Sequence, residues 1–93
     1  MFKKKRWIRL SYRQQGLVYF LCVNYSILPK KLKGEIDELC DEVGGFYAPA
    51  LRELLLRMEK GVCSVAMDYN MSDKRLNMLR KEFYERFYKK LSK

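Results

Sequence analysis

The sequence predicts an all-α fold of about five short helices. Apolar residues recur three and four positions apart along most of the chain, which is the spacing of a helix that buries one face. Proline and glycine interrupt this pattern at Pro29, at Gly44-Gly45 and at Gly61. Residues 17–23 contain enough aromatic and β-branched side chains to suggest a strand, but the rest of the chain offers no partner strand. A helix is therefore expected there as well.

The first helix is expected over residues 11–26, after a basic arm formed by residues 1–10. Ser11 suits the N-cap of this helix because its hydroxyl can accept a hydrogen bond from the first turn. Gly44-Gly45 is expected to end the second helix, since glycine adopts a left-handed conformation at no steric cost. That helix is predicted from about Lys30 to Val43, with a buried face made of Leu32, Ile36, Leu39, Cys40 and Val43.

Three further helices are expected in the second half of the chain. The third begins at about Ala48, has Pro49 in its first turn and ends at Gly61, and its buried residues are expected to be Leu51, Leu54, Leu55 and Met58. A compact fourth helix runs from Val62 to about Tyr69. The last runs from Asp73 to about Leu91, with an apolar stripe of Leu76, Leu79, Phe83 and Phe87.

The chain has 93 residues and a formal net charge of +9, from 20 Lys and Arg against 11 Asp and Glu. This length fits one domain, so residues 11–93 are expected to form a single helical domain behind the arm. A domain this basic attracts polyanions. Nucleic acid is the most favoured partner class, followed by an anionic membrane surface or an acidic protein.

The positive charge is concentrated at the two ends of the chain. Residues 62–93 have a net charge of +4, whereas residues 30–43 have a net charge of −2. The first thirteen residues contain no acid and six basic side chains, namely Lys3, Lys4, Lys5, Arg6, Arg9 and Arg13. A charge confined to particular segments is more informative about a binding surface than the total.

The three cysteines predict neither a disulfide framework nor a metal site. Cys22, Cys40 and Cys63 are scattered, lie in apolar contexts and are expected to be small core residues in a reducing cytoplasm. The chain has no histidine and no Cys-x-x-Cys pair, so no metal or other cofactor is expected. No apolar run is long enough for a membrane span, and the basic start is not followed by a signal-peptide pattern. A cytoplasmic protein without a membrane partner is expected.

Residues 62–79 place particular residue types at fixed positions. Ala66 supplies a small side chain where two helices would cross closely, with Val65 and Tyr69 facing the core. Asn70 occupies a turn position that requires a positive φ and usually holds glycine, and Ser72 can cap the helix that follows Met71. This pattern, continued to residue 83, resembles the helix-turn-helix of small DNA-binding proteins from bacterial phages and mobile elements.

The resemblance implies which residues would contact DNA. In this motif the first residues of the second helix enter the major groove, where lysine can donate to guanine and asparagine can pair with adenine. The implied base-contact candidates are Ser72, Asp73, Lys74, Asn77, Met78 and Lys81. The phosphate-contact candidates are Arg75, the arm residues Lys3, Lys4, Lys5 and Arg6, and the tail residues Lys89 and Lys90.

The expected function is sequence-specific binding of double-stranded DNA by a small transcriptional regulator that acts as a homodimer. Two alternatives remain open. One is a phage or mobile-element adaptor or inhibitor that binds a host protein through the acidic segment 35–42 or through exposed aromatic side chains. The other is an oligomeric accessory protein of DNA packaging or recombination.

Two further classes are disfavoured. An enzyme is not expected, because the chain has no histidine and no glycine-rich phosphate loop. Its clustered carboxylates, at residues 37–42, have the spacing of a solvent-exposed helix face. A stacking platform for single-stranded nucleic acid is conceivable from Phe46, Tyr47 and the aromatic residues of the last helix. We expect those aromatic residues to fill the core instead, with Tyr84 and Tyr88 covering the first helices or forming a dimer contact.

Overall fold

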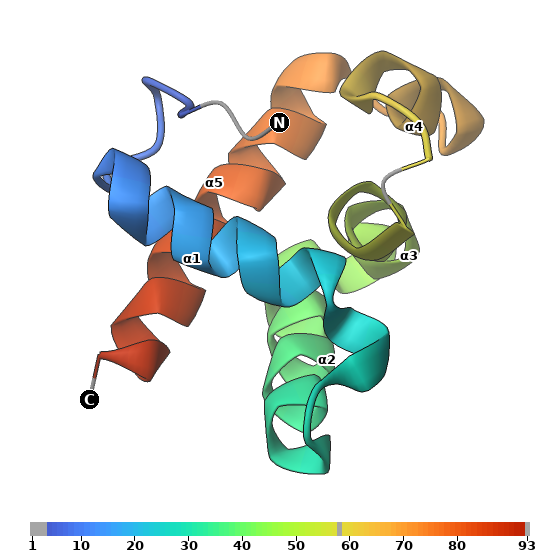
Figure 1. Ribbon diagram of the computed structural model, residues 1–93. Coiled ribbons are helices and arrows are strands. Elements are labelled where there is room, and N and C mark those ends of the chain that lie inside the picture. Colours follow the sequence, from blue (N-terminus) through green and yellow to red (C-terminus); the bar gives the residue numbers. More distant parts are fainter. Residues whose placement is uncertain (1–3, 58, 93) are drawn as a thin grey trace.

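The computed structural model describes residues 4–57 and 59–92, and in these two ranges all regular secondary structure is helical, with no strand (Figure 1). The predicted all-α class is therefore confirmed. The elements are α1 (Tyr12–Val23), η1 (Tyr25–Ile27), α2 (Lys30–Gly44), η2 (Gly45–Tyr47), α3 (Ala48–Arg52), η3 (Glu53–Arg57), α4 (Val62–Asp68) and α5 (Asp73–Leu91). In Figure 1, α5 runs through the length of the molecule and α1 crosses it.

Local signals explain most of the helix boundaries. Ser11 caps α1 as expected, and it forms a capping box in which Gln14 accepts a hydrogen bond from the Ser11 N–H at 2.8 Å. Gly45 has a φ of 54° directly after α2, which a glycine adopts without strain. The first helix ends earlier than expected, because the Asn24 side chain donates to the Phe20 carbonyl at 2.8 Å and the chain then tightens into the 3₁₀ turn of η1.

The third helix differs from its prediction. Only α3, five residues long, is α-helical, and η3 continues it with π-helical turns. Among the described residues, four α-helices have seven residues or more, so the expected number of about five is slightly too high. Leu51, Leu54 and Leu55 are buried as expected. Met58 lies outside the described residues.

The core consists of two clusters. The larger one joins α1, α2, the α3–η3 segment and the second half of α5, and its central residues are Val18, Cys22, Ile36, Leu39, Cys40, Leu51, Leu55, Phe83 and Phe87. The smaller one joins the α3–η3 segment, α4 and the start of α5, with Ala50, Leu54, Val65, Ala66 and Leu76 buried. The two leucines at 54 and 55 thus face different clusters, which fixes α4 and α5 onto the rest of the molecule.

Residues 4–10, expected as a basic arm, fold back onto α1 and α5. Ile8 is buried in the larger cluster. Gln15 of α1 is itself completely buried, and its side-chain amide donates to the carbonyls of Lys5 and Leu10 at 2.9 and 3.0 Å. Its carbonyl oxygen accepts from the Lys5 N–H at 2.8 Å. The buried Gln15 amide therefore supplies hydrogen-bond partners to backbone N–H and carbonyl groups of a segment that has no regular secondary structure.

Two expectations about buried side chains are wrong. Cys22 and Cys40 are core residues, but Cys63 is exposed on α4. Phe46 is also exposed, whereas Tyr84 is buried against the larger cluster and so covers the first helices.

In the described ranges, no helix combines the length and apolar character that crossing a membrane requires.

Candidate nucleic-acid interface

The α4–α5 corner, residues 62–81, is held by a short set of contacts. Ala66 is completely buried, and its carbonyl accepts a hydrogen bond from the Met71 N–H at 3.0 Å. Asn70 has a φ of 54°, the only positive value among the described non-glycine residues. Ser72 then caps α5 by accepting from the Arg75 N–H at 3.1 Å. These three local predictions are confirmed, and together they connect α4 to α5 through a turn of four residues.

Four of the six base-contact candidates meet at one place. Lys74, Asn77, Met78 and Lys81 of α5 line a hollow of ≈480 Å³ together with Trp7 of the N-terminal segment. The same helix buries Leu76 and Phe83 on its other side. The first half of α5 therefore presents polar, cationic and thioether groups to solvent beside an indole ring, with no backbone rearrangement needed to bring them together.

Trp7 is the residue of this hollow that the sequence analysis did not single out. Its ring lies under the Arg80 guanidinium, 5.4 Å from the ring centroid, and the Arg9 N–H donates to Glu85 at 2.8 Å. With Ile8 in the core between them, these two contacts fasten the segment along α5. Trp7 is the only tryptophan of the chain and follows four basic residues, which is the one signal that could have pointed to it.

The polar groups around the hollow are oriented by their neighbours on α5. The Asn77 side-chain oxygen accepts a hydrogen bond from Arg80 at 2.8 Å, and a carboxamide held by its oxygen still carries two N–H donors. The Lys81 ammonium lies 3.2 Å from Glu85, one helical turn away. Burial lowers the pKa of Arg80, but a guanidinium remains charged at any pH at which the protein folds.

The other two base-contact candidates are engaged within the protein. Ser72 is exposed, but its hydroxyl caps α5. Asp73 accepts a hydrogen bond from the Cys63 thiol at 2.7 Å, and this bond raises the pKa of Cys63 above its ordinary value. The Asp73 carboxylate also lies in the first turn of α5, where a negative charge is favourable. Both residues stabilise the α4–α5 corner whether or not they touch a ligand.

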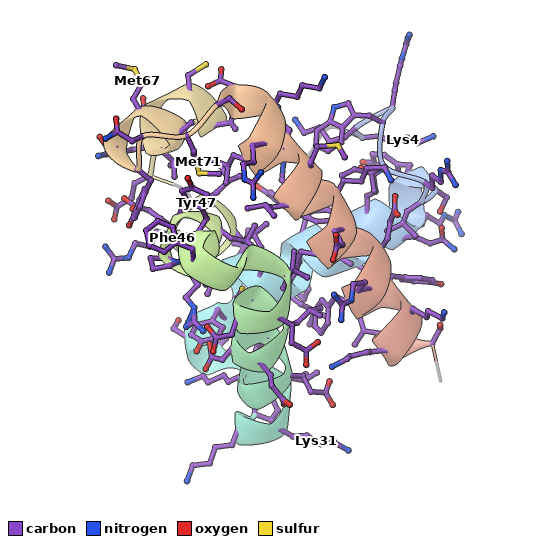
Figure 2. The ribbon with its side chains drawn as sticks, turned by 180° about the vertical axis from the view of Figure 1, so that it is seen from behind. Lys4, Lys31, Phe46, Tyr47, Met67 and Met71 are labelled. Carbon is purple, nitrogen blue, oxygen red and sulfur yellow. The ribbon has the colours of Figure 1, made fainter. Side chains whose placement is uncertain are left out.

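The N-terminal segment and the start of α5, which the Trp7–Arg80 contact holds together, are both rich in basic residues. Residues 4–13 and 72–81 contain a single acid, Asp73, against nine basic side chains: Lys4, Lys5, Arg6, Arg9, Arg13, Lys74, Arg75, Arg80 and Lys81. Figure 2 shows Lys4 at the same end of the molecule as Met67 and Met71, and Lys31 at the opposite end. Such a concentration of one sign attracts a polyanion to this end.

The phosphate-contact candidates are not all brought to this end. Lys4 and Arg6 are exposed near the hollow, and the Arg75 guanidinium lies over the Tyr47 ring, 5.4 Å from its centroid. Lys89 and Lys90 lie in the last turn of α5, about 24 Å along the helix from Lys74 at 1.5 Å per residue. Lys5 is half-buried beside Gln15, and Lys3 lies outside the described residues.

The acidic segment, which an alternative function would use, is largely engaged in ion pairs. Arg52 lies 3.7 Å from Asp37 and 2.7 Å from Asp41, and the Tyr25 hydroxyl donates to Asp37 at 2.7 Å. Glu42 pairs with Arg86 of α5 at 2.8 Å. These contacts tie α2 to its neighbours, so this segment has a structural role of its own.

Comparisons with known protein families, with curated proteins and with solved structures found no match to this chain. The part of the chain that the structure describes also contains no group of three or more Cys, Asp or Glu side chains that could hold a metal ion. The hollow on α5 brings together two lysines, a carboxamide and an exposed indole ring.

Proposed function

We propose that the protein binds double-stranded DNA sequence-specifically, with α4 and α5 acting as a helix-turn-helix, and that it serves as a small transcriptional regulator. The first half of α5 enters the major groove in this arrangement. The observation that carries the proposal is the convergence of Lys74, Asn77, Met78 and Lys81 around one solvent-exposed hollow, on the side of α5 opposite its buried stripe.

The chemistry of these side chains suits base edges. Lysine donates to O6 and N7 of guanine, and a carboxamide such as Asn77 can both donate to and accept from adenine. The Met78 side chain is 58% exposed and Trp7 is 39% exposed, so both can contact the methyl group of thymine. The surface therefore offers a distinct contact for three of the four bases.

The surrounding charge suits the phosphate backbone. Lys4 and Arg6 are exposed within three residues of Trp7, which lines the hollow, and Arg75 is exposed next to Lys74 on α5. Phosphate contacts fix the orientation of a protein on a duplex, whereas base contacts give the sequence preference. These basic side chains would thus hold α5 in the groove while the hollow contacts the bases.

The experiment begins with selection of preferred duplexes from a random pool, followed by fluorescence-anisotropy titrations of a selected duplex. Lys74→Ala and Asn77→Ala are expected to weaken binding to that duplex by about 5- to 150-fold, since a good base contact contributes roughly 1–3 kcal/mol. Lys74 is exposed on α5, so Lys74→Ala should retain the thermal stability of the parent protein; Asn77 is half-buried and accepts from Arg80, so the melting temperature of Asn77→Ala is measured alongside its affinity.

Lys31→Ala is the matched control, because Lys31 is an exposed lysine of α2 at the opposite end of the molecule (Figure 2). It removes the same charge as Lys74→Ala but is expected to change the affinity less than twofold. Equal losses for the two lysine variants would reduce the interaction to general charge attraction and contradict the proposal. Failure of the selection to enrich any sequence would contradict it as well.

A further inference from the structure

The α1 helix is apolar on its exposed side as well as on its buried side. Val18 and Cys22 face the larger core cluster, with exposed fractions of 0% and 2%. The outward side carries a second set of large apolar side chains, which we call the α1 face: Tyr12 at 58% exposed, Leu17 at 42%, Phe20 at 62%, Val23 at 46% and, in η1, Ile27 at 77%.

This composition is unusual for a helix at a protein surface. A helix that packs on one side normally turns charged and polar residues to the other. Residues 14–29 contain no Asp, Glu, Lys or Arg, although 33% of the whole chain is charged. Contiguous apolar patches of several hundred Å² generally mark a surface that another molecule covers.

We propose that the α1 face binds a second copy of this chain, with the two α1 helices packed antiparallel about a twofold axis near Phe20. Phe20 lies midway along the chain between Tyr12 and Ile27. A twofold axis at Phe20 therefore places the Tyr12 end of the face on one copy against the Ile27 end of the face on the other. The inference does not depend on DNA binding. Val18 and Cys22, on the opposite side of α1, share a cluster with Phe83 and Phe87 of α5, so the face points away from α5.

The area of the face is enough for the apolar centre of a dimer interface, with the remainder supplied by its rim. Five side chains that are each about half exposed present roughly 100 Å² apiece, or ~500 Å² in all. A stable interface buries ≈800 Å² on each partner, with an apolar centre and a polar rim. Gln14, Asn24 and Ser26 border the face and provide uncharged polar groups for that rim.

Charge favours a second copy as the occupant. With a net charge of +9, two copies repel each other across most of their surfaces, and the α1 face is the extended region without charge.

Sedimentation equilibrium of the wild-type chain and of Phe20→Ser tests the proposal. The wild type should sediment as a dimer that dissociates on dilution, and Phe20→Ser should raise its dissociation constant about thirtyfold or more, as expected for a central aromatic residue. Phe46→Ser is the matched control, because Phe46 is 89% exposed in η2; it should leave the constant within twofold. Ile27→Ser provides a second variant on the face itself.

Phe20 and Ile27 are exposed in the monomer, so circular dichroism at a dilution where only monomer is present should show the wild-type helix content. Three results would overturn the proposal. The first is a wild-type monomer at every concentration, and the second is an equal effect of Phe20→Ser and Phe46→Ser. The third is binding to vesicles of phosphatidylglycerol and phosphatidylcholine that Phe20→Ser abolishes without changing the oligomeric state, which would make a membrane surface the occupant.

Discussion

Asn70 decides how the chain turns between α4 and α5. Its φ of 54° lies in the left-handed region, which asparagine tolerates better than other residues with a side chain, and which costs an ordinary L-residue about 1–2 kcal/mol. Asn70→Ala should therefore lower the free energy of unfolding by about 1 kcal/mol, measured by urea denaturation. Asn70→Gly should change it by no more than a few tenths of a kcal/mol. Equal destabilisation by the two substitutions would show that the asparagine side chain, and not the backbone conformation, matters at this turn.

Cys40 makes stability depend on pH in the alkaline range. Burial is the main cause that raises the pKa of this thiol from 9.0 to about 12 in the folded protein. A raised folded pKa stabilises the protein below pH 9, and this contribution is lost as the pH rises from 9 toward 12 because the unfolded thiol ionises first. The free energy of unfolding should thus fall by about 1.4 kcal/mol between pH 7 and pH 10 from this group alone.

Cys40→Ala tests that contribution, because it removes the titrating thiol. Urea denaturation at pH 7 and pH 10 should show a smaller difference between the two pH values in the variant than in the wild type, even though the variant is less stable at both. Burial raises the pKa of Cys22 in the same direction, so part of the alkaline loss should remain. An unchanged difference would mean that Cys40 does not titrate as its burial requires.

At the scale of the elements, Gln15 connects the N-terminal segment to α1. Gln15→Ala removes hydrogen bonds to Lys5 and Leu10 and should cost about 1–3 kcal/mol of stability, because the Lys5 N–H and the Leu10 carbonyl both lose the Gln15 side chain as a partner. It should also speed amide hydrogen exchange at Lys5. Gln14→Ala is the control from the same helix: it removes only the bond to the Ser11 N–H and should leave exchange at Lys5 unchanged. If the Lys5 amide of Gln15→Ala exchanged as slowly as in the wild type, Gln15 would not be what holds the N-terminal segment on α1.

The sequence predicts those elements whose signals are local. α5 has a capping serine and a repeated apolar stripe, and α2 is bounded by proline and glycine, so both were located to within a residue. The π-helical turns of η3 have no such signature, because the apolar spacing of Leu51, Leu54 and Leu55 is also that of a regular α-helix. A helical period alone therefore predicts a regular helix there.

The candidate site could be predicted only in part, for the same reason. Helical spacing placed Lys74, Asn77 and Lys81 on one side of α5, and the structure brings them together around the hollow. The position of Trp7 depends on Arg80 and on the bond from Arg9 to Glu85, contacts between residues more than seventy positions apart. Such contacts leave no periodic pattern in a single sequence.

At the scale of the whole molecule, charge and apolar surface are separated. One end carries the cationic residues of segments 4–13 and 72–81 around the hollow, and α2 carries the acidic residues that pair with Arg52 and Arg86. The exposed apolar side chains of α1 lie on a third region. A protein built this way can hold a polyanion at one end while a second copy covers another surface, which is how a dimer would place two α5 helices on one duplex.

The most direct test of this arrangement is a two-dimensional ¹H–¹⁵N NMR titration of the protein with a duplex from the selection. The proposed interface predicts the largest amide shift changes at residues 5–9 and 72–81, and small changes at residues 30–43 of α2. Changes spread evenly over all basic segments, or centred on α2 with none in 72–81, would contradict DNA recognition by the α4–α5 corner.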